Sequence, residues 1–432
     1  MQQVPQLVRE LAQKTRGRVL IVGSLTSEQR ERSTYHAILQ AAQSSGVPCV
    51  PFSPPIRTEN IDASHASPAC LIDHAVDGLA MARRTGCASV LVVGGGSTIE
   101  VAKSIATLLS SKVNAETLTN PSTREAIIAQ AISTAAAAAP MIAVPTTFHG
   151  CVAASSNKTY LTDATEGSVF EMSEPSSDRL NGAGGVHVVV DSTLLASSSP
   201  IICAEGAISS LARVSDALLI NEGGTDTIGH DGGTALGELL GTLKNVLDES
   251  FQVYDNNLTS MASWVGDNEE NVSEQYGAIG CVVGSCISLG GPGITQSMAR
   301  VVASNYNVSF GQACAIVLPQ VCAIQMARSR KGSDATRGAA DVHAATVCFG
   351  SGSGSDPTMF QAFDRVRSHV LIPKPSTEEL KELTTAVLMD ASFKQAVSED
   401  NGKKTWTRSV VADLLEESFA FLENTKEKEA KV

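Results

Sequence analysis

Short apolar runs alternate with amphipathic segments along the first half of the chain. The runs Arg18–Gly23, Pro48–Phe52 and Ala88–Val93 predict buried strands, and the segments Ser27–Ser45 and Ala69–Arg84 have the periodicity of helices. Strands and helices that alternate at this spacing are typical of βαβ units, whose strands form a parallel sheet. The sequence therefore predicts an N-terminal α/β domain.

The pattern changes after Asp191. Further strands are predicted at Met141–Val144 and Val186–Val190, with a hairpin within Ser155–Met172, but beyond residue 191 only helical periodicity remains. The helices predicted there are Ala204–Asn221, Thr234–Tyr254, Glu269–Ile287, Thr295–Ser304, Gly311–Arg328 and Thr377–Val397. We therefore expect a Rossmann-like parallel-sheet domain over residues 1–191 and an all-helical domain over residues 192–432, with a solvated tail from about residue 423.

Composition and charge narrow the class of protein. The 432-residue chain is 43% hydrophobic but only 4% aromatic, so we expect sizeable cores built from aliphatic side chains. The formal charge of −13 disfavours nucleic acid and anionic membranes as partners, and the apolar stretch Ala126–Pro145 is too weakly hydrophobic to span a membrane. Ten cysteines without a C-x-x-C pair indicate reduced thiols. We expect a cytoplasmic homodimer that acts on a small-molecule substrate.

One motif points to a bound phosphate. In the sequence VLVVGGGSTIEVAKSIA, residues 90–106, a predicted strand ends in Gly94, Gly95, Gly96 and Ser97 and continues directly into a helix. Glycines let the backbone approach a ligand, and the N–H groups of a helix N-terminus bind anions. This pattern favours a cradle for a pyrophosphate. The alternative is a tight strand–helix turn in which Ser97 is only the N-cap.

This segment resembles the GGGS-x-x-D-x-A-K motif of the iron-containing alcohol dehydrogenase and dehydroquinate-synthase-like superfamily, with Glu100 in place of the aspartate. Three further segments resemble that family in the same order: Pro145-Thr146-Thr147, then Val188–Leu195, and then Gly311–Pro319. The resemblance implies a cleft between two domains that holds substrate and NAD or NADP. It implies that the cofactor is bound by the glycine turn at residues 94–97, by Glu100, and by Thr146 and Thr147.

The resemblance also implies a metal site that this sequence lacks. Metal-dependent members of the family bind iron or zinc through Asp-x-x-x-His on one helix and two later histidines. The corresponding positions in this sequence are Ile208, Ala212, Gln296 and Phe310. We therefore predict no metal cofactor. A rebuilt site within residues 226–230, where Asp and His have i,i+4 spacing, stays open as an alternative to a polar glycine-rich loop.

A few residues are candidates for the chemistry. His149 follows the Pro-Thr-Thr turn, and its imidazole can exchange a proton near neutral pH; the alternative is a histidine that caps a loop. Arg300 lies one helical turn after Gln296, so both are predicted to face the vacated metal position, unless Arg300 forms a surface salt bridge. Lys158 in the predicted hairpin is a weaker candidate. Cys151 fits an ordinary apolar thiol better than a nucleophile.

Three functions are consistent with these features. The first is a metal-independent NAD(P)-dependent oxidoreductase that acts on a small carbonyl, alcohol or enol acid, because relatives of the maleylacetate reductase type work without a metal. The second is a lyase, dehydratase or cyclase that uses the metal-free cleft for acid–base chemistry. The third is a binding protein without activity. The substrate and the choice between NAD and NADP are not fixed by the sequence.

Overall fold

A computed structural model of the chain divides into two compact units. The first contains Met1–Ser198 and Val265–Ser285, and the second contains Ser199–Trp264 and Cys286–Val432. The structure describes residues 4–23, 29–44, 46–53, 72–134, 138–163, 168–173, 186–196, 198–221, 239, 242–243, 246, 250, 276–285, 293–306, 308–329, 363, 366–368, 370, 372, 374–399 and 406–420. Most of the predicted helix Thr234–Tyr254, the candidate metal segment 226–230 and the tail lie outside these residues.

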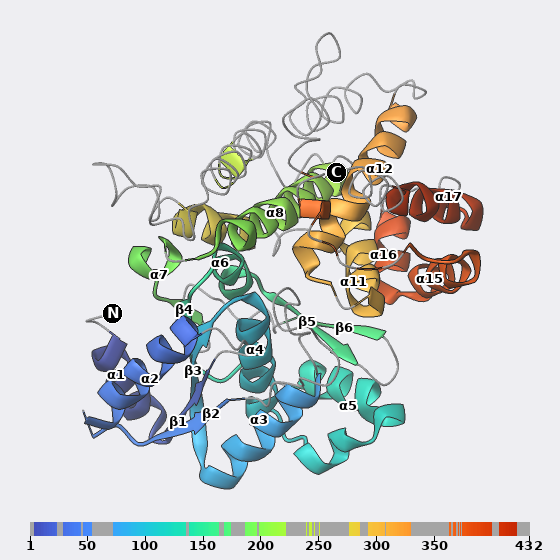
Figure 1. The fold of residues 1–432 in the computed structure, drawn as a ribbon. Coiled ribbons are helices and arrows are strands. Elements are labelled where there is room, and N and C mark those ends of the chain that lie inside the picture. The colour runs from blue at the N-terminus through green and yellow to red at the C-terminus, as the bar shows by residue number, and fades with distance from the viewer. Residues whose placement is uncertain are drawn as a thin grey trace, which may run out of the picture. The chain divides into compact units, whose positions relative to one another are not determined.

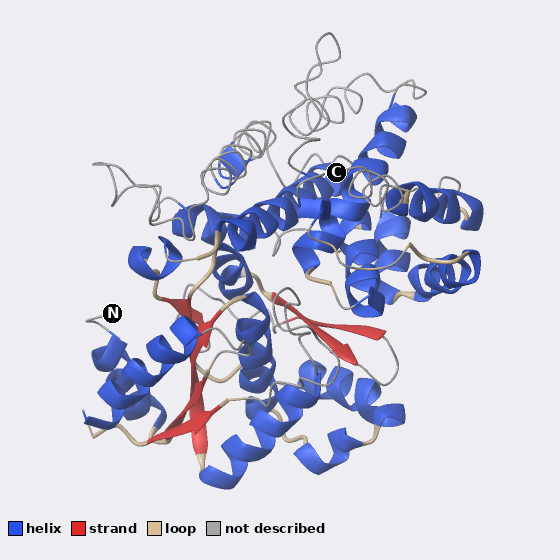
Figure 2. Ribbon diagram, viewed as in Figure 1, coloured by secondary structure: helices blue, strands red, loops and turns tan. Residues whose placement is uncertain are grey.

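The first unit is built on a five-stranded parallel sheet, drawn in red in Figure 2. Its strands are β1 (Arg18–Val22), β2 (Cys49–Phe52), β3 (Cys87–Gly94), β4 (Met141–Pro145) and β7 (Val186–Val188), in the order β2-β1-β3-β4-β7. Every neighbouring pair is parallel. The predicted α/β domain is confirmed, and the continuous apolar runs of β1, β3 and β4 are those of strands buried on both faces.

Helices cover both faces of this sheet. Leu20 and Val92 point into a core with one set of helices, whereas Ile21 and Val93 point into a second core with another set. This is the alternation expected of successive strand residues. The first set is α3 (Ile72–Thr85), α4 (Gly96–Ser110) and α5 (Pro121–Thr134), with the 3₁₀ helix η1 (Ala115–Thr119); the second is α1 (Val4–Thr15) and α2 (Gln29–Ser44) (Figure 1).

Two short helices and a hairpin also belong to the first unit. A short helix, α6 (Phe148–Ser155), follows β4, and α7 (Ser192–Ala196) follows β7. Between them, β5 (Lys158–Asp163) and β6 (Ser168–Ser173) pair as an antiparallel hairpin. The predicted hairpin is therefore confirmed.

The described part of the second unit is helical, as predicted. It comprises α8 (Pro200–Asn221), α11 (Ile294–Tyr306), α12 (Phe310–Ser329), α15 (Thr377–Met389), α16 (Ala391–Glu399) and α17 (Arg408–Phe419). The predicted single helix over Thr377–Val397 is wrong, because the chain breaks at Asp390. That residue leaves the helical conformation (φ −58°, ψ 130°), and its carboxylate accepts a bond from the N–H of Phe393 at 2.7 Å, which starts α16.

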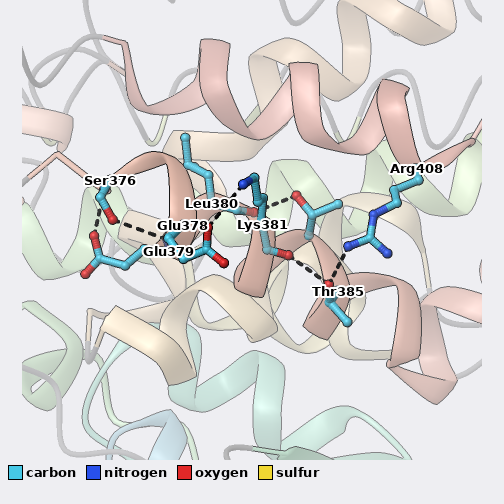
Figure 3. Close-up of polar contacts among 8 residues, drawn as sticks. Ser376, Glu378, Glu379, Leu380, Lys381, Thr385 and Arg408 are labelled. Carbon is cyan, nitrogen blue, oxygen red and sulfur yellow. Dashed lines mark hydrogen bonds and ion pairs between the residues drawn. The ribbon is translucent and has the colours of Figure 1, made fainter.

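Polar contacts fix the start of α15 and its place beside α17 (Figure 3). Ser376 and Glu379 form a reciprocal capping box, in which each side chain accepts a bond from the other residue's backbone N–H. Arg408 at the first position of α17 donates to the hydroxyl of Thr385 at 2.9 Å.

Among the helices that the structure describes, none is long and apolar enough to cross a membrane.

Candidate functional site

The glycine turn joins β3 to α4 without a capping side chain. Gly95 is the N-cap in an extended conformation (φ −78°, ψ −173°), and α4 begins at Gly96. Ser97 lies inside the helix, so the alternative in which Ser97 is the N-cap is wrong. Because the N-cap has no side chain, the first-turn N–H groups can be approached by a phosphate without displacing a capping group from that residue. The turn fits the pyrophosphate of a dinucleotide.

The start of α6 packs directly on this turn. Thr147 is the N-cap of α6, and its hydroxyl accepts a bond from the N–H of Gly150 at 3.0 Å. A Cβ atom placed on Gly150 would lie 3.3 Å from the carbonyl oxygen of Gly94, and the N–H of Thr146 donates to that same oxygen at 3.0 Å. The predicted cofactor residues of both motifs, those of the glycine turn and those of the Pro-Thr-Thr turn, therefore lie together.

His149 lies against the glycine turn. A Cβ atom on Gly96 would overlap Cδ2 of the His149 ring and would lie 3.0 Å from its Nε2. The ring is half-buried, so part of it stays in contact with solvent. Gly96 is thus needed for the ring to fit, and His149 is held where it can contact a group bound at the turn.

The two polar residues inside α4 make structural contacts. Glu100 is buried and accepts a bond from the N–H of Tyr160 in β5 at 3.1 Å. The Lys103 side chain, 1% exposed, donates to the carbonyl oxygens of Ala153 and Ser156, at 3.0 and 2.6 Å, where α6 ends. A buried cation at a helix C-terminus satisfies carbonyl groups that have no helical partner. A role of Glu100 in binding the cofactor stays a prediction.

Lys158 stands at the start of β5, where its backbone pairs with Ser173. The structure describes nothing of its side chain, so its predicted role in catalysis stays a prediction.

A group of buried charges forms in the second unit. We call Arg213, Asp216, Gln296, Arg300 and Phe310 the basic cluster. The guanidinium carbons of Arg213 and Arg300 lie 5.2 and 5.9 Å from the centroid of the Phe310 ring, and these arginines are 2% and 6% exposed. Such distances are those of cation–π contacts. Because Arg300 is buried, the alternative of a surface salt bridge is wrong.

Hydrogen bonds order this cluster. Arg300 Nη2 donates to Gln296 Oε1 at 3.2 Å, which confirms that the two side chains share one face of α11. The carboxylate of Asp216 on α8 accepts bonds from the N–H groups of Thr295 and Gln296, at 3.1 and 2.9 Å, and so caps α11 from a neighbouring helix. Burial raises the pKa of Asp216 to about 6, against these bonds and the charge of Arg300, which lower it.

The residues at the four family metal positions do not fit a metal ion. Ile208 and Ala212 are fully buried apolar side chains in α8, Phe310 is aromatic, and the amide oxygen of Gln296 accepts a bond from Arg300. The nearby guanidinium groups would also repel a divalent cation. In the part of the chain that the structure describes, no three His, Cys, Asp or Glu side chains come together as a metal site.

Comparison with known proteins shows what the N-terminal part of the chain is similar to. Residues 1–176 match the model of the iron-containing alcohol dehydrogenase family. This match confirms the resemblance to that family for the two motifs that lie within residues 1–176, the glycine turn and the Pro-Thr-Thr turn. No curated protein sequence matches the chain.

Solved structures show that the whole chain has this fold. It is similar to the iron-containing alcohol dehydrogenase of Thermotoga maritima, with 14% identity, a TM-score of 0.66 and 96% of each chain covered. The NADH-dependent butanol dehydrogenase A of the same organism has 13% identity and a TM-score of 0.64, covering 97% of this chain and 95% of its own. The maleylacetate reductase of Agrobacterium tumefaciens has 14% identity and a TM-score of 0.57, covering 97% and 94%.

Sequence reasoning missed two polar residues of α8. Arg213 lies in a helix rich in apolar residues, which is a usable signal, because arginine is rarely buried without a reason. Glu205 accepts bonds from the hydroxyl of Ser309 at 2.7 Å and from the amide of Gln312 at 3.0 Å, and burial raises its pKa to about 7. Nothing in the local sequence indicates this contact, since its partners are over a hundred residues away.

Proposed function

We propose that the protein is a metal-independent NAD(P)-dependent oxidoreductase that acts on a small carbonyl, alcohol or enol acid. The observation that carries this proposal is the pair of guanidinium groups, those of Arg213 and Arg300, beside Phe310, which is at one of the four positions where the family places metal ligands. A chain that keeps the nucleotide turn and has buried cations beside the lost metal positions retains two features that a reductase needs. These are a cofactor and a positive charge for the reacting oxygen.

The glycine turn supports the part of the proposal that concerns binding of the nucleotide cofactor. The backbone N–H groups at residues 94–97 would hold the pyrophosphate, with Thr146 and Thr147 beside it. When bound, the nicotinamide supplies or accepts the hydride. His149, which lies on Gly96, would contact a bound group and exchange a proton with it or with the substrate.

The basic cluster supports the part of the proposal that concerns the substrate. A fixed cation stabilises negative charge on an alkoxide, enolate or carboxylate oxygen, and it does so more strongly where burial lowers the local dielectric constant. Arg300 is held by Gln296, so its guanidinium needs little reorganisation when charge develops. The half-buried ring of Phe310 adds an apolar surface, which favours a substrate larger and less polar than a simple alcohol.

Chelation tests this proposal directly. The protein is dialysed against EDTA, its metal content is measured by elemental analysis, and oxidation of NADH and NADPH is followed with a panel of aldehydes, 2-oxo acids and enol acids. We expect activity without bound iron or zinc and no loss on chelation. An activity that disappears with EDTA and returns with Fe²⁺ or Zn²⁺ contradicts metal independence. Nucleotide binding with conversion of substrate but no net oxidation supports a lyase, dehydratase or cyclase instead.

A further inference from the structure

The helical segment 276–285 lies in very close contact with α6. A Cβ atom on Gly280 would lie 2.7 Å from Cβ of Cys151 and 3.1 Å from the carbonyl oxygen of Phe148. One turn later, a Cβ atom on Gly284 would overlap the carbonyl oxygen of Val152. The two glycines therefore let the segments approach backbone to backbone. Both segments belong to the first unit.

This approach places two thiols against each other. Cys281 follows Gly280, and its sulfur is hydrogen-bonded with the thiol of Cys151 and with the side chain of Ser155. Cys151 is fully buried, whereas Cys281 is partly exposed, and both are free thiols. An exposed thiol beside a buried thiol is the arrangement in which one sulfur can meet a reagent and the other can react with the product.

The hydrogen bond divides the proton unequally between the two sulfurs. The bond from Cys151 lowers the pKa of Cys281 to about 6, although burial opposes this, and Ser155 lowers it further. Donating the same bond raises the pKa of Cys151 well above that of an ordinary thiol, and burial adds to this rise. At neutral pH, Cys281 is therefore the thiolate and Cys151 the thiol.

Three other described cysteines have a raised pKa instead of a lowered one. Burial raises the pKa of Cys49, of Cys87 and of Cys314. Cys49 is partly exposed like Cys281, so exposure alone does not distinguish Cys281. The difference is the hydrogen bond with the thiol of Cys151, since the thiol of Cys87 near Cys49 raises the pKa of Cys49.

We propose that Cys281 and Cys151 form a redox-active pair that hydrogen peroxide converts into a disulfide. The Cys281 thiolate attacks one oxygen of the peroxide; a sulfur–oxygen bond forms, the O–O bond breaks, and hydroxide leaves and takes up a proton. The Cys151 thiol then attacks the resulting sulfenic acid; a sulfur–sulfur bond forms, and the released hydroxide leaves as water with the thiol proton. Two thiols are oxidised by two electrons, and one peroxide is reduced to two waters.

The inference does not depend on the proposed dehydrogenase activity. Cys151 is in the same short helix as His149 and two residues after it, so the disulfide would tie segment 276–285 to the helix that packs on the glycine turn. The site is thus a covalent modification site in the nucleotide-binding unit.

The first test is the reactivity of the thiols in the full-length protein. The protein is pulsed with iodoacetamide at pH 7, quenched and mapped by mass spectrometry. We expect Cys281 to be alkylated roughly tenfold faster than Cys49, the matched partly exposed thiol, because a larger fraction of it is thiolate. In denaturant the two rates should become equal. Equal rates in the folded protein contradict the proposal.

The second test is the product of oxidation. After treatment with one equivalent of hydrogen peroxide, a peptide linked through Cys151 and Cys281 should appear and should disappear with dithiothreitol. The Cys151→Ser variant should instead accumulate sulfinic acid at Cys281, whereas Cys49→Ser should leave the linked peptide unchanged. A disulfide that maps to another cysteine, such as Cys286, or sulfinic acid at Cys281 in the unaltered protein overturns the inference. If Cys151→Ser does not fold, the peptide map of the unaltered protein still decides.

Discussion

The substitution Gly96→Ala tests whether His149 is held by the glycine turn. The added Cβ atom would overlap Cδ2 of His149 and lie 3.0 Å from Nε2, whereas unstrained carbon contacts need about 3.5 Å, so the ring must move by about 1 Å or more. Overpacking of this kind costs about 1–3 kcal/mol. Alanine in place of glycine in a helix returns at most about 1 kcal/mol. The net cost should therefore lie between about 0 and 3 kcal/mol, with His149 displaced from the turn.

A double-mutant cycle measures this contact. Urea unfolding followed by circular dichroism gives the free energy of unfolding of the unaltered protein, of Gly96→Ala, of His149→Ala and of the double variant. Since His149→Ala removes the ring, Gly96→Ala should cost nothing or become slightly stabilising in that background, with a coupling energy of about 1 kcal/mol or more. If Gly96→Ala costs the same in both backgrounds, the ring does not lie on Gly96. Titration with NADH then shows whether displacing the ring also weakens nucleotide binding.

Three further predictions concern the buried charges. Lys103→Met should lower the free energy of unfolding by about 1–3 kcal/mol in urea titrations, because it leaves two carbonyl oxygens at the end of α6 without their cation; an unchanged value contradicts the capping role. Burial raises the pKa of both Glu205 and Asp216, so the folded state binds protons more tightly at these two groups. Their contribution to the free energy of unfolding should be full below about pH 4 and be lost as the pH rises towards 7, and Glu205→Gln should remove part of this pH dependence. Arg300→Met should lower kcat/KM by roughly 100-fold while leaving the unfolding midpoint unchanged or higher. A loss of stability that matches the loss of activity would show that Arg300 is only structural.

The hydrophobic pattern was sufficient to predict the strands of the sheet, because strands buried on both faces have continuous apolar runs. The pattern did not predict where a helix ends when local hydrogen bonds set that end. Met389 and Phe393 continue one helical pattern across Asp390, but the carboxylate of Asp390 starts a new helix there. The helices α1, α5 and α17 were not predicted either. The sequence of α5 (Pro121–Thr134) has little amphipathic contrast, so its hydrophobic pattern does not predict a helix.

Those features of the candidate site that depend on neighbouring residues could be predicted from the sequence. The motif predicted the turn between β3 and α4, and the i,i+4 spacing predicted that Gln296 and Arg300 share a face. What the sequence could not indicate is why each glycine is present. Gly96 makes room for His149, and Gly280 makes room for α6, and both contacts join segments that lie far apart in the chain.

The basic cluster is not explained by the stability of the fold. The cluster contains two buried guanidinium groups and one buried carboxylate. Moving a charge from water into the protein costs several kcal/mol per ion, and contacts inside the protein offset this cost only in part. Well-packed apolar residues of similar size would be as stable or more stable at these positions. The raised pKa of Asp216 shows that even its carboxylate is poorly compensated there. Cations that are kept at this cost, beside the family's metal position at Phe310, point to a task that needs positive charge. For this reason we propose that the reacting oxygen binds there.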